Sequence, residues 1–294
     1  MTCPVTDWIN KNVSGAGFYE PVRFSGFPEI KESLVSGHLP ATFMLAPLAM
    51  ALRQQGVKIR IVYLGHRDGT ALMVHKDSNI HSFADLRGKK IAVPNRFSNQ
   101  FLLLYKGLRD HGLTVNDVDL VEMPPPDMPA ALFSRSVDLI TSGEPFMAQT
   151  QIEGYGRVLY QAKDIWPNFI SCVLVVREDV ITEHHDWVQR LVNGIASSGK
   201  WLQAGMDNRM EAAEVVAKNY YNQNPKLLRY VLSQPPDRVT YANLKLARKD
   251  FEIIERLALE AGVLDGSVSF DDYADPSFSD NVQIVRSDGG VEQK

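Results

Sequence analysis

A carboxylate stands where one apolar run of the sequence gives way to a new segment. In "TSGEPFMAQ" (141–149), Glu144 lies between Gly143 and Pro145. Proline is favoured in the first turn of a helix, because its missing N–H costs nothing there. The stretch therefore predicts a strand, a tight turn at Gly143 and a helix that begins at Pro145. A carboxylate at such a junction could accept hydrogen bonds from a ligand or act as a base in a closed cleft.

An arginine and two asparagines surround the start of a second predicted helix. In "NRFSNQ" (95–100), Ser98 or Asn95 could cap a helix over 98–111, while Arg96 and the free N–H groups face an anionic ligand. A structural cap with an outward-pointing arginine fits the pattern equally well. Asp7 and Asp127 are expected to be helix caps first and ligand partners second.

The sequence contains none of the common catalytic motifs. There is no GxSxG elbow, no HExxH, no phosphate-binding P-loop and no GxGxxG between a strand and a helix. Cys3 and Cys172 lie in apolar runs without Cys/His metal spacing, and His184 and His185 are expected to be solvated. We therefore expect no cofactor, no metal and no catalytic residue, and we favour binding over catalysis.

The spacing of prolines and glycines points to an internal duplication. In each of the segments 22–56 and 121–156, two prolines are 19 residues apart and a glycine follows 9 residues later. These residues are Pro28, Pro47 and Gly56 in the first segment and Pro126, Pro145 and Gly154 in the second. Because the order of the predicted elements matches as well, we expect two similar α/β halves.

Apolar runs alternate with helical patterns through residue 176. The expected strands are 19–25, 41–46, 59–64, 70–75, 89–94, 118–123, 137–142, 157–161 and 170–176, and the expected helices are 28–37, 47–55, 98–111, 126–134 and 145–153. This alternation predicts an α/β fold with mainly parallel sheets and helices on both faces. About 90 further residues have helical spacing, which predicts a C-terminal helical appendage packed on one lobe.

We expect two lobes with a ligand cleft between them. Residues 1–80 and 170–294 would form lobe 1 and residues 81–169 lobe 2, joined through crossing segments near 76–82 and 162–170. In open parallel sheets, ligands bind beyond the carboxyl ends of strands, where helix N-termini offer free N–H donors. The candidate ligand-binding residues are therefore Thr6, Asp7, Trp8, Ser25, Phe27, Ala46, His66, Asn95, Arg96, Ser98, Asn99, Asp127, Glu144, Trp166 and Asn168.

Composition and charge narrow the class of partner. The 294 residues carry a formal net charge of −4, with 31 Lys and Arg against 35 Asp and Glu, which argues against nucleic acid or an anionic membrane. No stretch approaches the length of apolar sequence that a membrane span needs. The N-terminus lacks the basic and apolar regions of a signal peptide, so we expect either a cytoplasmic chain or a trimmed mature form.

Four stretches resemble one known family. "VRFSGFPEIKESLVSG", "FADLRGKKIAVP", "SGEPFMAQ" and "WPNFISCVLVVRED" are similar to the nitrate/sulfonate/taurine (bicarbonate) group of ABC-transporter substrate-binding proteins, and the similarity runs over residues 19–275. The resemblance implies the two-lobed type II periplasmic-binding-protein fold, which closes on a small solute and delivers it to a membrane permease and its ATPase. It also implies that Ser25, Ala46, Asn95, Ser98 and Glu144 face the ligand, and that the chain is periplasmic or anchored outside the membrane.

The leading hypothesis is a monomeric solute-binding protein, not an enzyme, that holds a small polar anion or zwitterion. The first copy of the duplication has Ala46 where the second has Glu144, which makes Glu144 the best candidate for a ligand-specific group. One departure keeps other readings open, because the family shows a longer first strand and helix than "MTCPVTDWINKNVSGAGFYEP". The alternatives are a cytoplasmic enzyme of cofactor biosynthesis on the same fold, with Glu144 or Asp7 as acid/base, and a ligand-sensing module.

Overall fold

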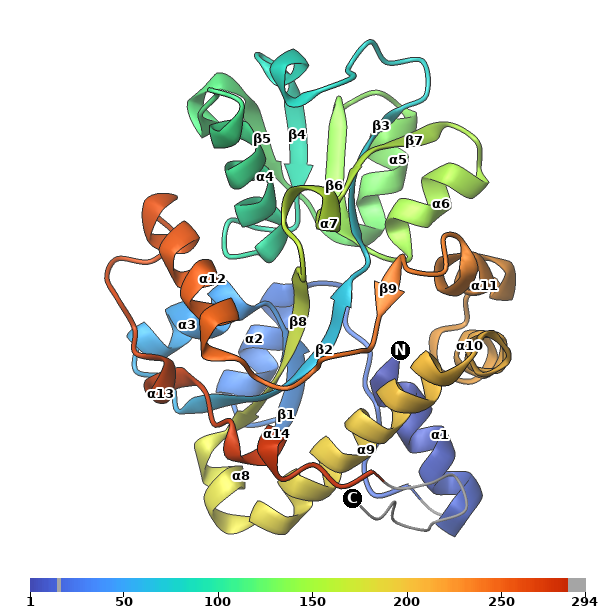
Figure 1. Cartoon of the computed structure of the whole chain (residues 1–294), viewed down its shortest axis with the longest axis vertical. Helices are drawn as coiled ribbons and strands as arrows, with labels where there is room; N and C mark the ends of the chain where they lie inside the picture. Colours follow the sequence, from blue (N-terminus) through green and yellow to red (C-terminus); the bar gives the residue numbers. More distant parts are fainter. Residues whose placement is uncertain (15–16, 285–294) are drawn as a thin grey trace.

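Two β-sheets divide the structure into two lobes (Figure 1). The computed structural model describes residues 1–14 and 17–284. The strand order is β1-β8-β2-β9 in lobe 1 and β5-β4-β6-β3-β7 in lobe 2. The strands are β1 (Ala41–Met44), β2 (Ile59–Asp68), β3 (Thr70–His75), β4 (Lys90–Val93), β5 (Asp119–Glu122), β6 (Leu139–Gly143), β7 (Gly156–Gln161), β8 (Ile170–Arg177) and β9 (Val239–Thr240).

The predicted α/β architecture is confirmed, but the sheets are mixed rather than mainly parallel. In lobe 2, β4 pairs in parallel with β5 and β6, whereas β3 pairs antiparallel with β6 and β7. In lobe 1, β1 and β2 both pair antiparallel with β8, and β9 pairs antiparallel with β2. The reason is topological: β8 returns from lobe 2 and enters the lobe 1 sheet between β1 and β2, so it runs against both.

The five helices predicted before residue 154 lie within a few residues of their expected positions. They are α2 (Phe27–Val35), α3 (Ala46–Gln54), α4 (Asn99–Asp110), α5 (Met128–Phe133) and α6 (Phe146–Ile152). Helix α3 is apolar on all sides, which explains why residues 46–52 are all buried. Its counterpart α6 begins one residue after Pro145 rather than at it. Both copies therefore place a helix directly after a strand, as the proline spacing predicts.

The N-terminal region differs from the prediction. Residues 19–25 were expected to form a strand, but they take part in no β-pairing of the described structure. The apolar start of the chain forms α1 (Thr2–Ser14), which packs against α9 (His185–Ala204) and α10 (Met206–Val216). The apolar residues of "MTCPVTD" form part of this helix, and one face of α1 buries its side chains on these two helices.

Two short crossings connect the lobes. The first lies at Asp68 and Gly69, with φ of 57° and 70°, rather than near 76–82. Strand β3 belongs to the lobe 2 sheet, although the division of the sequence at residue 80 assigns it to lobe 1. The second crossing passes through Asn168, with φ of 61°, into β8. The Asp68 N–H donates to the Phe169 carbonyl oxygen at 2.9 Å, so the two crossings are hydrogen bonded to each other.

A buried arginine fixes these crossings to the C-terminal part of the chain. Arg67 donates through Nη1 to the Asn168 carbonyl oxygen at 2.7 Å and through Nη2 to the Asp250 carboxylate at 2.7 Å. Its Nε donates to the Asn243 carbonyl oxygen at 2.9 Å. We call the two crossings, at Asp68–Gly69 and at Asn168, the hinge. One guanidinium therefore joins the hinge to the start of α12 (Arg248–Glu260).

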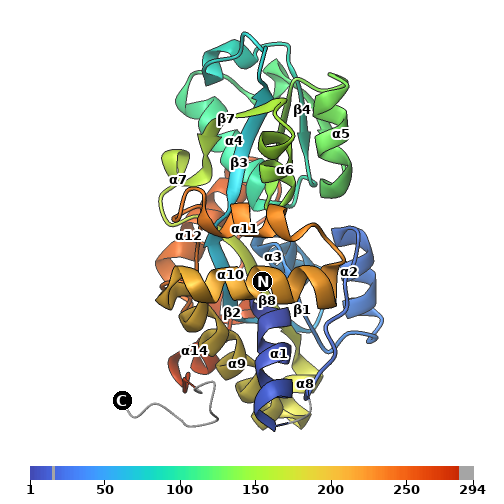
Figure 2. The same ribbon diagram turned by 90° about the vertical axis from the view of Figure 1, so that its right-hand side faces the viewer.

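The residues after 176 are mostly helical, as expected, but they do not pack on one lobe alone. Besides α9, α10 and α12, they form α8 (Glu178–Glu183), α11 (Pro225–Ser233), α13 (Phe270–Tyr273) and α14 (Ser277–Asp280). Helix α11 packs on α6, and α12 packs on α4, so this appendage contacts lobe 2 at two places. Figure 2 shows α11 lying across the boundary between the lobes.

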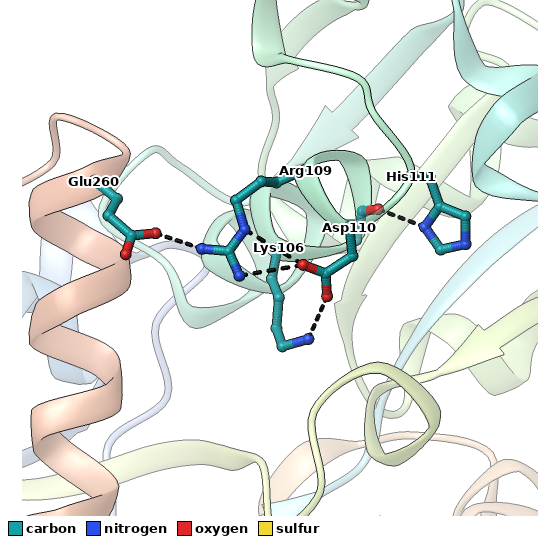
Figure 3. Close-up of polar contacts among 6 residues, drawn as sticks. Lys106, Arg109, Asp110, His111 and Glu260 are labelled. Carbon is teal, nitrogen blue, oxygen red and sulfur yellow. Dashed lines mark hydrogen bonds and ion pairs between the residues drawn. The ribbon is translucent and has the colours of Figure 1, made fainter.

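We call the contact between α12 and α4 the α12 contact, and define it by Tyr105, Arg109 and Glu260. Figure 3 shows Arg109 and Glu260. The Tyr105 hydroxyl donates to the Glu260 carbonyl oxygen at 3.1 Å, and Arg109 forms an ion pair with the Glu260 carboxylate. Arg109 also contacts Asp110, which accepts a hydrogen bond from Lys106 at 2.5 Å. The appendage thus holds lobe 2 through side chains on the outer surface.

Within the described residues, no helix is both long and apolar enough to cross a membrane.

Candidate functional site

A cavity of about 720 Å³ lies at the boundary between the lobes, beside α11. Lobe 2 contributes residues 144–146, at the junction between β6 and α6, to its wall. Lobe 1 contributes the extended segment 18–24, residues 38–43 and His66 of β2, and the appendage contributes residues of α9, α11 and β9. Loops and strand ends from distant parts of the sequence therefore converge on one site, as expected for a cleft between two α/β lobes.

Most of the cavity wall is apolar, and aromatic side chains are prominent in it. They come from both lobes and from the appendage: Phe18, Tyr19, Phe24, Phe43, Phe146, Trp187, Tyr220 and Tyr241. Ligand pockets of about 300–1,000 Å³ hold organic molecules and are lined mainly by such side chains. The volume and lining of this cavity suit an organic molecule better than a small inorganic ion.

Two of the cavity hydroxyls are already engaged within the protein. Tyr19 donates to the Cys3 carbonyl oxygen at 2.6 Å, and Tyr220 donates to Asp7 Oδ2 at 2.8 Å. By contrast, His66 Nδ1 and Gln223 Oε1 are buried and have no hydrogen-bond partner within the described residues. Both residues belong to the cavity wall, so a rotation of either side chain would present its unpartnered atom to a bound molecule.

His66 is neutral at physiological pH. Burial lowers the pKa of its imidazole to about 4. The ring stands edge-on to Tyr241, with centroids 6.3 Å apart. A neutral imidazole offers one donor and one acceptor, so His66 can hydrogen bond a ligand without contributing charge.

Glu144 reaches the cavity wall, but its carboxylate has partners in the protein. Oε1 lies 2.5 Å from Arg238 Nη1, and Oε2 accepts from the Ala148 N–H at 2.8 Å. Arg238 is held in turn by the Gln234 carbonyl oxygen at 2.7 Å and by Gln151 Oε1 at 2.8 Å. We call the contacts among Glu144, Gln151 and Arg238 the Arg238 contact. They explain the carboxylate structurally, so Glu144 loses its place as the best ligand-specific group.

This arrangement also changes the expectation for an anion at the start of α6. The Ala148 N–H, in the first turn of that helix, is occupied by the Glu144 side chain rather than free for a ligand. The backbone N–H of Glu144 donates to the Gly69 carbonyl oxygen at 2.8 Å, while Gly69 donates to the Arg238 carbonyl oxygen at 2.7 Å. The β6–α6 junction is therefore fastened directly to the hinge.

A second group of polar side chains lies where β4 and β6 end and α4 begins. Ser98 caps α4 by accepting from the Phe101 N–H at 3.0 Å, as predicted, and donates to the Asn95 carbonyl oxygen at 2.7 Å. Asn99 donates to the Ile170 carbonyl oxygen, and Gln100 donates to Thr70 Oγ1 at 3.1 Å. These side chains tie lobe 2 to the crossings and do not line the 720 Å³ cavity.

Four oxygen atoms of this second group are buried without a hydrogen-bond partner among the described residues. They are Asn95 Oδ1, Asn99 Oδ1, Gln100 Oε1 and Thr141 Oγ1. Buried polar atoms in native proteins are almost always hydrogen bonded to protein or water. Their concentration beside the hinge marks the place where a bound molecule or water would complete the polar contacts.

Three candidate residues near the N-terminus lie in α1 rather than in a loop at the cleft. Thr6 and Ser198 share a hydrogen bond of 2.7 Å, and Trp8 packs against Trp201 with ring centroids 5.8 Å apart. Asp7 is fully buried, and its carboxylate contacts Tyr220 and Lys11, the latter at 2.6 Å. Residues 2–14 form a helix, and none of these three residues lines the large cavity.

The remaining candidates lie away from the large cavity. Ser25 donates to Glu29 at the start of α2, where Phe27 is the first residue, and Ala46 is fully buried at the start of α3. Arg96 has a side chain 62% exposed and lies 3.9 Å from Glu122, and Asp127 is exposed. Trp166 and Asn168 line a second cavity of about 230 Å³ between the hinge and α12. Of the fifteen candidates, the structure brings His66 and Glu144 to the large cavity.

The sequence reasoning missed the wall that the appendage supplies. Gln223, Arg238 and Tyr241 lie in a region that was expected to pack on one lobe as a peripheral structure, so none of them was considered. A signal was present in the helical amphipathicity of "PKLLRYVLSQ", whose apolar face lines the cavity through Leu228, Val231 and Leu232. That pattern indicates a buried face but not which surface covers it.

In the part of the chain that the structure describes, no cluster of three or more His, Cys, Asp or Glu side chains could hold a metal ion.

Comparisons with known sequences agree with this architecture. Residues 9–217 match the NMT1-like family. The chain is 23% identical over 232 residues to the putative aliphatic sulfonates-binding protein of Escherichia coli K12, covering 77% of this chain and 70% of that protein. It is 26% identical over 220 residues to the bicarbonate transport ATP-binding protein of Synechocystis, covering 68% of this chain. The chain spans 32% of the length of that relative.

Solved structures match almost the whole chain. The ligand-binding component of an ABC-type import system from Staphylococcus aureus has a TM-score of 0.83 at 25% identity, covering 96% of this chain and 94% of that one. The periplasmic nitrate-binding protein of Synechocystis PCC 6803 has a TM-score of 0.85 at 12% identity, covering 95% and 84%. The desulfurization enzyme DszB has a TM-score of 0.62 at 20% identity, covering 95% and 94%. The fold thus occurs in binding proteins and also in an enzyme.

The resemblance seen in the sequence and the two-lobed α/β fold are both confirmed by these matches. The two named sequence relatives are a transport ATP-binding protein and a sulfonates-binding protein. Because the family match extends over well over half of its residues, the chain belongs to the NMT1-like family.

Proposed function

We propose that the protein is the solute-binding component of an ABC-type importer. The observation that carries this proposal is the 720 Å³ cavity, whose wall is shared by two lobes that two short crossings connect. Rotation about Asp68, Gly69 and Asn168 would open and close the cavity around a solute. The chain would act as a monomer outside the cytoplasmic membrane, periplasmic or anchored, and deliver its solute to a permease driven by an ATPase.

The solute in this proposal is a small organic anion or zwitterion of the sulfonate or taurine type. Arg23 brings a positive charge to the wall, and the rest of the lining is mainly apolar. An ion the size of nitrate or bicarbonate would leave most of the 720 Å³ volume unfilled and would gain little from apolar walls. The name of the Escherichia coli relative, an aliphatic sulfonates-binding protein, supports the same class of ligand.

A thermal-shift panel tests the proposal. Nitrate, bicarbonate, taurine, alkanesulfonates and amino acids would each be added at increasing concentration. A ligand present at a hundred times its dissociation constant stabilises the folded state by about 2.7 kcal/mol, so at least one organic anion or zwitterion should raise the melting temperature. If no member of the panel does so, the proposal is overturned.

Two matched variants locate the binding. Val231→Trp places extra volume in the cavity wall and should abolish the ligand-dependent shift. Val35→Trp makes the same change at a valine that is 49% exposed and lies outside the cavity, and it should leave the shift unchanged. Equal loss of the shift in both variants would place the ligand elsewhere.

The enzyme alternative finds support in the likeness to DszB. Its two candidate acid/base groups, however, are engaged: Glu144 with Arg238, and Asp7 with Tyr220 and Lys11. Incubation of the protein with each ligand that it binds, followed by mass spectrometry, should return the ligand unchanged. Turnover that disappears in Glu144→Gln, while binding persists, would establish the enzyme instead.

A further inference from the structure

We propose that the cavity recognises an aromatic ring that carries an N–H or O–H donor, with the ring held among Phe24, Phe43 and Phe146 and the donor bonded to Gln223. This inference rests on the proposed solute-binding function and specifies the class of solute.

The first argument is that some aromatic side chains of the cavity wall have no aromatic neighbour. Within the described residues, Phe24, Phe43 and Phe146 line the cavity and make no contact with another ring. Phe18, by contrast, meets Tyr19 and Trp187, with centroids 4.9 and 6.2 Å away. Aromatic rings gain from edge-to-face or offset contacts with one another. A flat ring in the cavity would supply these contacts to the three phenylalanines.

These three phenylalanines come from separate parts of the fold. Phe24 lies in the extended segment before α2, Phe43 lies in β1, and Phe146 begins α6 in lobe 2. They line one cavity because both lobes contribute to its wall, so closure would bring Phe146 onto a bound ring that already lies on the lobe 1 wall. The contact of a bound ring with both lobes is what couples its binding to closure.

The second argument is hydrogen-bonding capacity. Gln223 Oε1 is a buried acceptor without a partner within the described residues, and His66 Nδ1 is also buried and unpartnered. The nearby tyrosine hydroxyls of Tyr19 and Tyr220 are already donating elsewhere. A solute without a donor would leave Gln223 Oε1 unsatisfied, and such a site rejects analogues that lack the matching group.

Three sulfonates test the aromatic ring and the hydrogen-bond donor of the solute separately. Sulfanilate has an aromatic ring and an amino group, benzenesulfonate has the ring alone, and cyclohexanesulfonate has a ring of the same size that is not aromatic. Dissociation constants would be measured by calorimetry at pH 7.5. We expect benzenesulfonate to bind about tenfold more tightly than cyclohexanesulfonate, because several ring contacts are gained. Sulfanilate should bind at least a further tenfold more tightly.

Substitutions in the cavity wall show which residues cause the preference for an aromatic ring and which cause the preference for a donor. Phe43→Leu and Phe146→Leu keep the wall apolar but remove a ring, and each should reduce the preference for benzenesulfonate over cyclohexanesulfonate. Gln223→Leu should reduce the preference for sulfanilate over benzenesulfonate. Phe133→Leu changes a phenylalanine that is 65% exposed and lies outside the cavity, and it should alter neither preference. Melting temperatures verify that each variant is folded.

The possible outcomes distinguish failure of this inference from failure of the proposed solute-binding function. Equal binding of benzenesulfonate and cyclohexanesulfonate overturns ring recognition and leaves the solute-binding function standing. Failure of all three sulfonates to bind, while taurine or nitrate binds, also overturns this inference alone. Failure of every compound in both panels overturns the inference and the proposed function together.

Discussion

Glu144 and Arg238 form an ion pair across the boundary between the lobes, with side chains only 4% and 2% exposed. Glu144 belongs to the β6–α6 junction of lobe 2, and Arg238 lies directly before β9 in the lobe 1 sheet. Both residues are also hydrogen bonded through their backbones to Gly69, so the pair lies beside the first crossing. The pair therefore fastens the two lobes to each other at this crossing, and its rupture would leave two buried charges without a partner.

Glu144→Gln should destabilise the protein by about 3 kcal/mol. Removal of one partner from a buried ion pair costs about 3–5 kcal/mol, and the glutamine side chain retains part of the hydrogen bonding. Urea unfolding at pH 7.5 measures the change. Glu211→Gln replaces an exposed glutamate of α10 and should change the free energy of unfolding by less than about 0.5 kcal/mol. If the two variants are equally stable, the pair does not hold the lobes.

The α12 contact should stabilise the protein much less than the Arg238 contact. The side chains of Arg109 and Glu260 are 44% and 38% exposed, and an exposed ion pair contributes about 0.2–1 kcal/mol. A double-mutant cycle with Arg109→Ala and Glu260→Ala should therefore give a coupling free energy below about 1 kcal/mol. High salt should reduce it further, because exposed charges are screened. A coupling of about 3 kcal/mol that persists in 1 M NaCl would contradict this account.

Gly69→Ala should destabilise the hinge more than an ordinary glycine substitution. Gly69 has φ of 70°, and an added Cβ would lie 2.9 Å from Val239 Cγ2. Gly56→Ala is a matched control, since Gly56 has φ of 82° and an added Cβ would meet no atom within 4 Å. The control should lose about 1–2 kcal/mol from the left-handed conformation alone. Gly69→Ala should lose at least 1 kcal/mol more, measured by urea unfolding, because the contact with Val239 adds overpacking.

His66 should make stability depend on pH between about 6.5 and 4. Burial lowers the pKa of the folded imidazole to about 4 from an ordinary value of 6.5. Between these values the unfolded chain binds a proton that the folded protein excludes. The contribution to stability is therefore complete above pH 6.5 and is lost as the pH falls towards 4, by at most about 3 kcal/mol.

His66→Gln removes this titration. The difference in unfolding free energy between the original protein and His66→Gln should shrink as the pH is lowered from 7 to 4.5. His81→Gln, at an exposed histidine, should show a difference that is independent of pH. A constant difference for His66→Gln across the same range would show that this histidine is not buried in the neutral form.

Much of the fold could be predicted because local signals and tertiary packing agree. Apolar strands such as 70–75 and 170–176, and helices that begin near Pro28, Pro47 and Pro145, were located within a few residues. The first crossing was missed because the apolar runs 59–64 and 70–75 are separated only by a short polar stretch. Only the turn at Asp68 and Gly69 marks the change from one lobe to the other, and such a turn could equally well have joined two strands of one sheet.

The site was less predictable than the fold. Its polar candidates were chosen by their position after strands, and Glu144 illustrates the limit of that rule. The position was right, since Glu144 reaches the cavity, but its partner Arg238 lies 94 residues further along the chain. Local sequence contains no information about a partner that tertiary packing brings in from such a distance. The same holds for Gln223 and Tyr241.

Lobe 2 has one further property that its connectivity dictates. The strands of its sheet, from β3 to β7, lie in a continuous stretch of residues 70–161, whereas the lobe 1 sheet is complete only when β8 and β9 have joined it. Arg238 and Glu260, the residues that fasten lobe 2 to its neighbour, come later still. The chain of lobe 2 is therefore complete before the part of the cavity wall that α9, α11 and β9 supply, so its sheet can form before these contacts exist.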